Sequence, residues 1–203
     1  MITKKFKFLL ITAFAFSVAG FLSQANIEIN AQTRFDQAMR KAEVTSGDEF
    51  TVTVKTPQGA NIYAVRQPSS AMLRAIDKGL SELFSVARKN NYRSRLNHSD
   101  YTIFIARPDR RNNRDGAYSP GIAIPNGQYA GSVYDQWGVV YVAGKVISFN
   151  PSAFIISDYD REFNQVSDIV RYEGEHIVLY HNDRRRFRET ADHSRGGSHP
   201  ILN

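Results

Sequence analysis

Apolar and polar residues alternate between Phe50 and Thr56, in the order Phe-Thr-Val-Thr-Val-Lys-Thr. An alternation with a period of two predicts a strand with one buried face. The tripeptide Pro-Gln-Gly at 57–59 is typical of a turn, and a second run rich in apolar residues follows at 60–65. The pattern therefore predicts two antiparallel strands.

A longer periodicity begins after this pair of strands. Between residues 70 and 87, apolar side chains recur every three or four residues, which predicts an amphipathic helix. Gly79 lies in the middle of this segment. Because glycine in a helix costs about 1 kcal/mol relative to alanine, we expect a close packing contact there. The apolar positions are Met72, Leu73, Ile76, Leu80, Leu83, Phe84 and Ala87.

Further segments rich in β-forming residues predict additional strands. The dipeptide Asn126-Gly127 is a strong signal for a two-residue hairpin, so two of the segments are expected to pair antiparallel. The sequence thus predicts an α+β fold with a mostly antiparallel sheet. The segments are 101–106, 121–125, 128–134 and 138–149.

A second long helix is predicted from Ser157-Asp158 to about His181, with Glu162 placed to complete a capping box. Its apolar residues fall on one side of a helical wheel and define a buried stripe. From about Asp183 onward the chain is polar, and we expect a loop that reaches the C-terminus. The residues of the stripe are Val166, Ile169, Val170, Ile177 and Tyr180.

The N-terminus has the pattern of a secretory signal peptide. Lys4, Lys5 and Lys7 precede an apolar run at 8–22, and Ala25 follows it at a favourable cleavage position. We therefore expect a signal at 1–25, with cleavage after residue 31 as an alternative, and a single exported α+β domain at 32–203. The protein would be secreted or periplasmic, with no stable membrane anchor after signal removal. Retention of the run as a membrane anchor is the rival interpretation, although about 15 apolar residues are near the lower limit for a span.

Composition narrows the chemistry that the chain can carry. The absence of cysteine excludes thiol nucleophiles and cysteine-based metal sites. Removal of residues 1–25 takes away three lysines and lowers the formal charge from +6 to +3, so no nucleic-acid partner is expected. The dense basic cluster at 184–188 is typical of a segment that follows a helix end. A binder of anionic polymers is a third class, and it predicts a steep loss of binding with salt.

The most informative motif is Tyr172-Glu-Gly-Glu-His176. In the zinc-binding motif H-E-x-x-H, two imidazoles one helical turn apart bind the metal and the glutamate acts as general base. On the predicted helix, Glu173 falls within the apolar stripe and His176 at its edge, so both side chains face one cavity. Glu175 falls on the opposite side, where we expect it to be solvent-exposed.

The strand-rich middle of the chain, followed by a helix that carries Y-E-G-E-H, resembles the catalytic region of zincin metallopeptidases. The resemblance implies a zincin-like fold, Zn²⁺ as cofactor, Glu173 as general base and His176 as a metal ligand. Tyr172 stands at the position of the first histidine. Downstream residues would then complete the metal site, and the candidates are His181, Asp183, His193 and His199.

We therefore predict an exported metal-dependent hydrolase that acts on a peptide or protein substrate. The alternative is a catalytically silent extracytoplasmic binding domain of the same fold, in which Glu173 and His176 form a buried hydrogen-bonded pair. In that alternative His181 and Asp183 have capping or turn roles, and His193 and His199 lie in solvent.

Overall fold

The computed structural model describes residues 31–107, 146–158, 163–191 and 197–202. Its contacts divide the chain into two units, Met1–Gln37 and Ala38–Asn203. Residues 31–37 of the first unit are helical, and the sheet and the two long helices belong to the second unit. The predicted signal segment and the predicted strands at 121–125 and 128–134 lie outside the described residues. Within the described ranges, no helix combines the length and the apolar character that a membrane span requires.

Five strands form one sheet in the order β1-β2-β3-β5-β4. The two outer pairs are antiparallel, whereas the inner pairs β2/β3 and β3/β5 are parallel. The α+β prediction is confirmed, but the sheet is mixed rather than mostly antiparallel. A helix connects β2 to β3, and such a crossover returns the chain in the same direction. The strands are β1 (Val52–Lys55), β2 (Asn61–Ala64), β3 (Tyr101–Ala106), β4 (Val146–Phe149) and β5 (Ser152–Ser157).

The predicted hairpin at the start of the sheet is confirmed, because β1 and β2 pair antiparallel with Val52 opposite Ala64. The turn closes through the side chain of Thr56, whose Oγ1 accepts a hydrogen bond of 3.0 Å from the Ala60 amide. Gly59 has a φ of 97°, a backbone conformation that glycine adopts without strain. Local turn chemistry therefore sets the register of this pair.

Strand β5 was not predicted, and it ends at Ser157, where the second long helix was expected to begin. The Asp158 carboxylate forms an ion pair with Arg66, and the described part of the helix begins at Phe163. All six residues of β5 are buried, as expected for a central strand covered on both faces. The apolar run at 154–156 was the sequence signal for such a strand.

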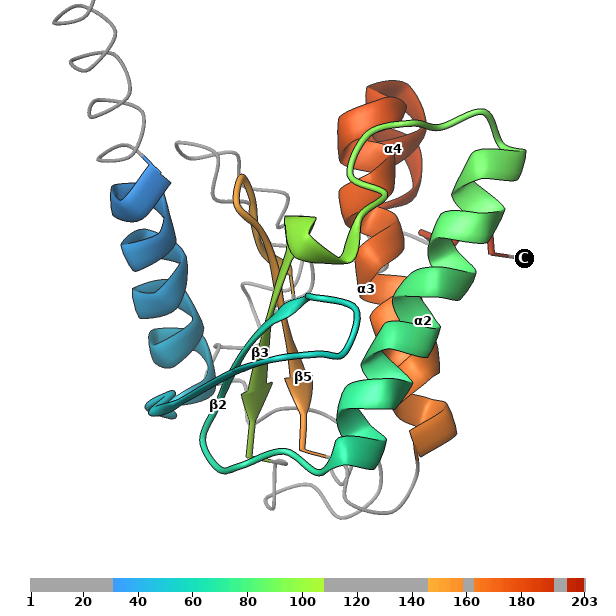
Figure 1. The fold of residues 1–203 in the computed structure, drawn as a ribbon. Helices are drawn as coiled ribbons and strands as arrows, with labels where there is room; N and C mark the ends of the chain where they lie inside the picture. Colours follow the sequence, from blue (N-terminus) through green and yellow to red (C-terminus); the bar gives the residue numbers. More distant parts are fainter. Residues whose placement is uncertain (1–30, 108–145, 159–162, 192–196, 203) are drawn as a thin grey trace, which may run out of the picture. The chain divides into compact units, whose positions relative to one another are not determined.

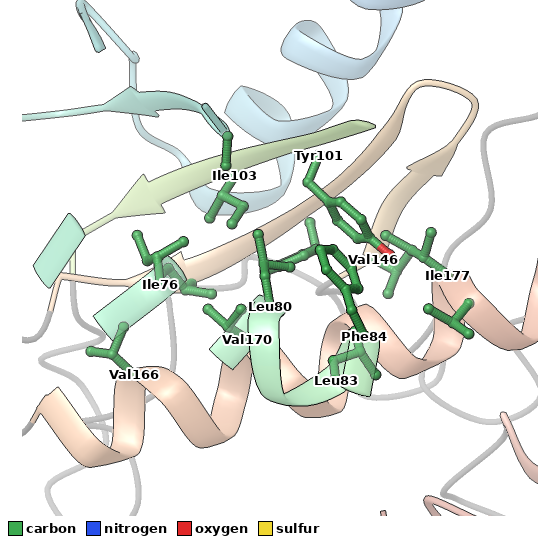
Figure 2. Packing of buried hydrophobic residues seen from close by; sticks show 14 of the residues in the cluster. Ile76, Leu80, Leu83, Phe84, Tyr101, Ile103, Val146, Val166, Val170 and Ile177 are labelled. Carbon is green, nitrogen blue, oxygen red and sulfur yellow. The ribbon is translucent and has the colours of Figure 1, made fainter. Parts of the chain in front are cut away.

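Helices α2 (Ser70–Lys89) and α3 (Phe163–Asn182) lie side by side against one face of the sheet (Figure 1). The Ser69 side chain caps α2 by accepting a hydrogen bond of 3.1 Å from the Met72 amide. Figure 2 shows the apolar side chains of both helices converging on those of the strands. They include Ile76, Leu80, Leu83, Phe84, Tyr101, Ile103, Val146, Val166, Val170 and Ile177.

The opposite face of the sheet has its own apolar cluster. Ala38 and Ala42, within the helical segment 38–46, are fully buried with Phe50 and Phe104 in this cluster. The rings of Phe50 and Phe104 are 5.1 Å apart. Apolar layers therefore cover both faces of the sheet, which explains why its central strands are buried throughout.

The two long helices approach closely at Gly79, as the sequence predicted. A Cβ atom at this position would lie 2.5 Å from the backbone oxygen of Ser167 on α3. The Ser167 hydroxyl donates a hydrogen bond of 2.9 Å to the Ala75 carbonyl, which joins the same two helices. Only a residue without a side chain allows this separation.

The segment after α3 is not a simple polar loop. It forms the short helix α4 (Arg184–Thr190), in which Phe187 is buried, and Ile201 near the C-terminus is also buried. Phe187 packs edge-on against Phe149 of β4, with ring centroids 5.3 Å apart. Apolar residues spaced far apart in this segment thus attach it to the domain.

Candidate functional site

Helix α3 is buried on all sides in the stretch that carries the motif. All seven residues from 173 to 179 are buried. One side of the helix faces α2 and the sheet, and the C-terminal segment 197–202 covers part of another side through contacts with Glu175. Glu175 was predicted to be solvent-exposed, but its side chain is fully buried. The prediction failed because the helical wheel showed only the surface that faces the main core.

Glu175 binds the C-terminal segment through both carboxylate oxygens. Oε2 lies 2.7 Å from Nδ1 of His199, and Oε1 accepts a hydrogen bond of 2.8 Å from the Ile201 amide. An ionised carboxylate can only accept, so Nδ1 of His199 is the donor. In the neutral imidazole, the lone pair is then on Nε2.

The His199 ring lies against two residues of the motif. Its centroid is 5.0 Å from that of His176 and 4.5 Å from that of Tyr172. His176 is buried, and Glu173, three residues earlier on the helix, is 9% exposed. We call Tyr172, Glu175, His176 and His199 the histidine cluster, and Glu173 lies three residues before His176 on the same helix.

The structure thus joins two of the predicted metal ligands, His176 and His199, from positions 23 residues apart in sequence. The tail closes over the motif helix, rather than leaving His199 in solvent, since the His199 side chain is only 17% exposed. Tyr172 packs its ring against His199. Two of the remaining candidates, His181 and Asp183, make structural contacts elsewhere.

His181 contacts the sheet. Its Nε2 donates a hydrogen bond of 2.7 Å to the Phe149 carbonyl, because a carbonyl oxygen can only accept. Burial lowers the pKa of His181, and the hydrogen bond to Phe149 offsets only part of this effect. The structure therefore gives His181 a structural contact with β4, and its predicted role as a metal ligand remains a prediction.

Asp183 is the N-cap of α4, which confirms the capping role. Its Oδ1 accepts a hydrogen bond of 3.0 Å from the Arg186 amide, and Oδ2 accepts one of 3.2 Å from the Tyr92 hydroxyl. The bond from the Arg186 amide is the main reason why the pKa of Asp183 is lowered. His193, the last candidate, lies outside the described residues.

The donor set fits a divalent metal in part. Metal-binding histidines commonly donate their second ring N–H to a carboxylate, as His199 does to Glu175. In the parts of the chain that the structure describes, however, no three His, Asp or Glu side chains are placed to hold one ion. The histidine cluster therefore supplies two imidazoles and needs a further ligand from elsewhere.

Glu175 is the residue of the site that the sequence argument assigned wrongly. A signal for its burial was present, because the apolar residues Val178 and Leu179 flank it on the helical wheel, away from the main stripe. Both are buried. Apolar residues on a second side of a helix indicate a second packing partner, and here part of that partner is the C-terminal segment.

Comparison of the chain with protein-family models gives no match, and neither curated proteins nor solved structures contain a similar protein at a significant level. No family assignment follows from these comparisons. The histidine cluster itself is therefore the basis for a functional proposal.

The lowered pKa of His181 leads to a pH-dependence of stability. The folded protein holds the imidazole neutral at pH values where the unfolded chain, with a pKa of about 6.5, already protonates it. The contribution of neutral His181 to the free energy of unfolding is thus fully present above about pH 6.5 and is lost as the pH falls through the folded-state pKa of His181.

We expect the free energy of unfolding of the wild-type chain to fall more steeply below pH 6.5 than that of His181→Gln. Glutamine has an amide that can donate to Phe149 but does not titrate. Urea unfolding at intervals between about pH 5 and pH 7.5 measures the difference. If the free energy of unfolding changed with pH in the same way for both proteins, His181 would not contribute to the pH-dependence of stability.

Proposed function

We propose that the protein is an exported metal-dependent hydrolase with the histidine cluster as its active site. The observation that carries this proposal is the 2.7 Å contact between His199 Nδ1 and Glu175 Oε2, beside the His176 ring. A buried carboxylate on Nδ1 fixes the orientation of the ring and the tautomer that carries its lone pair on Nε2. That is the arrangement expected of a histidine that binds a metal or accepts a proton.

In this proposal His176 and His199 hold Zn²⁺, and a further ligand comes from a residue such as His193. Zinc, when bound, supplies a Lewis acid that makes water nucleophilic near neutral pH. Glu173 is the proposed general base, since it lies three residues before His176 and its burial favours a proton-accepting role over a solvated one. The proposed substrate is the carbonyl group of a peptide bond.

Glu175 and Tyr172 support the site without contacting the substrate. Glu175 orients His199 through Nδ1, while Tyr172 packs against the same ring. Tyr172 occupies the position at which a zincin carries its first histidine, and in this proposal His199 supplies the imidazole that is missing there. The site is thus completed by tertiary structure rather than by the local motif.

The proposal predicts about one zinc ion per chain after reconstitution of the purified protein with ZnSO₄. His176→Ala and His199→Ala should each lose the ion, because each removes an imidazole ligand. Glu175→Gln should weaken zinc binding about 10- to 100-fold, as expected when the partner of a metal-binding histidine is altered. Elemental analysis and competition with a zinc-sensitive dye measure both effects.

His98→Gln is the matched control, because it removes a histidine outside the cluster and should leave the zinc content unchanged. Glu173→Gln should keep the metal but lose peptide hydrolysis, since an amide cannot accept the proton. A folded wild-type chain that takes up no zinc would contradict the metal-dependent proposal.

The catalytically silent binding domain is the second candidate, and one observation favours it. The Glu175 carboxylate has a donor on each oxygen, from His199 and from the Ile201 amide. A buried carboxylate satisfied in this way explains the cluster as a clamp for the C-terminal segment. Absence of zinc, together with unfolding of Glu173→Gln, would support this candidate.

A further inference from the structure

A dense basic surface lies at one end of the helical layer, separate from the histidine cluster in sequence. Two segments form it, residues 88–93 at the C-terminal end of α2 and residues 184–188 in α4, and together they contain seven basic residues and no acidic one. Acidic residues next to it, Asp183 and Glu189, pair with Arg186 and Arg185 at 3.9 and 3.8 Å. The basic residues, which we call the arginine patch, are Arg88, Lys89, Arg93, Arg184, Arg185, Arg186 and Arg188.

Hydrogen bonds hold the two segments of the arginine patch together. The Asn182 side-chain oxygen accepts from the amides of Arg93 and Ser94, both at 2.9 Å. The Arg186 guanidinium donates from Nη1 to the Tyr92 hydroxyl at 3.3 Å. Figure 1 shows the chain after α2 passing beside α4. The charges therefore form one surface, although they are about 90 residues apart in sequence.

Most of these side chains are exposed, with Arg185 at 83% and Arg186 at 39%. Seven basic residues against two acidic neighbours leave a formal charge of +5, compared with +6 for the entire chain. Concentrated like charge opposes folding through self-repulsion. An anionic partner would offset this repulsion.

The patch offers charge but few apolar or stacking groups. Tyr180 is covered, because its ring stacks on Phe149 at 3.9 Å and the Arg184 guanidinium lies 3.3 Å above it. Among the described residues Val44 is the one large apolar side chain that is exposed, and it lies outside the patch. A surface without exposed aromatic rings is poorly suited to single-stranded nucleic acid, which is bound by base stacking.

We propose that the arginine patch binds the anionic phosphate surface of a lipid bilayer. Guanidinium groups match phosphate oxygens, and binding to a membrane surface requires only charge on an accessible face. The expected export of the chain would bring it to a bilayer surface, and this choice of partner rests on that expectation. The binding is electrostatic and reversible, without insertion into the hydrocarbon.

The test compares the full chain on vesicles of pure phosphatidylcholine and on vesicles that also contain phosphatidylglycerol. The ratio of the two partition coefficients measures the electrostatic contribution to vesicle binding. An apolar N-terminal segment would bind both kinds of vesicle and would therefore leave the ratio unchanged. The triple variant Lys89→Gln, Arg185→Gln and Arg188→Gln should lower this ratio about 100-fold, at about fivefold per charge. Salt at about 1 M should abolish the wild-type preference.

A second triple variant is the matched control. Lys55→Gln, Arg74→Gln and Lys78→Gln remove the same net charge from exposed positions on β1 and α2 outside the arginine patch. This variant should change the ratio only a few-fold. Equal losses for both variants would mean that net charge rather than the patch determines binding, and would overturn the proposal.

Binding of the same proteins to duplex DNA of mixed sequence is measured as a second experiment. If the patch variant weakened DNA binding while its vesicle ratio stayed at the wild-type value, the partner would be a nucleic acid and the proposal would be wrong. A wild-type chain with no preference for anionic vesicles at low salt would also overturn it. Circular dichroism of both variants establishes that they remain folded, and a patch variant that unfolds is replaced by its three single substitutions.

Discussion

Glu175→Ala is expected to lower the free energy of unfolding by about 2–4 kcal/mol, since a buried donor left without its acceptor costs about 1–3 kcal/mol and the Glu175 carboxylate accepts from two donors. The substitution removes the acceptor for His199 Nδ1 and for the Ile201 amide, and both donors are then left without that acceptor. It also leaves a cavity beside a fully buried part of α3. Urea unfolding with far-UV circular dichroism measures the change.

The same substitution should release the C-terminal segment before the rest of the domain unfolds. Hydrogen exchange of the Ile201 amide is expected to accelerate in Glu175→Ala, because its hydrogen bond is lost. Glu189→Ala is the control: its side chain is 57% exposed and forms a surface ion pair with Arg185 at 3.8 Å, so an effect within about 0.5 kcal/mol is expected. Equal stabilities for Glu175→Ala and Glu189→Ala would show that the clamp contributes nothing.

Gly79→Ala is expected to destabilise the domain by about 2 kcal/mol. Alanine would favour the helix by about 1 kcal/mol in an exposed position, but here its Cβ would lie 2.5 Å from the Ser167 backbone oxygen. A backbone atom cannot rotate away, so α2 and α3 must separate and lose part of the packing shown in Figure 2. Equilibrium unfolding in urea checks the loss.

Two further substitutions serve as comparisons for the stability of Gly79→Ala. Ser85→Ala lies on the exposed side of the same helix and should be neutral or slightly stabilising. Gly174→Ala meets the Cδ2 atom of Leu83 at 2.6 Å, and that flexible side chain can shift, so the expected cost is smaller than at Gly79. A Gly79→Ala protein as stable as Ser85→Ala would mean that the helices separate without loss.

Local sequence signals predicted the elements that depend on local chemistry. The alternating run and turn at 50–65 predicted the β1–β2 hairpin, and the three- and four-residue spacing predicted α2. Gly79 was correctly expected at a close contact, since an unfavourable residue in a helix needs a packing reason. Strand β5 was missed because the periodicity of a short apolar run bounded by serines does not distinguish a buried strand from a buried helix segment.

The direction of the central strands was also not predictable from local pattern. Alternation describes which face of a strand is buried, but it does not state which strand lies beside it. β3 pairs with β5 across about 50 residues of chain, and this pairing makes the sheet mixed. Such contacts depend on how the helices cross between strands rather than on the composition of the strands.

For the candidate site, the sequence by itself determined that Glu173 and His176 lie one turn apart on a helix, because helix geometry follows from chain spacing. Only the tertiary structure decided that His199 joins them and that Glu175 is the buried carboxylate holding it. The physical reason is that a helical wheel records periodicity around one element. Burial on a second side depends on a distant segment, here 197–202, that folds back over the helix.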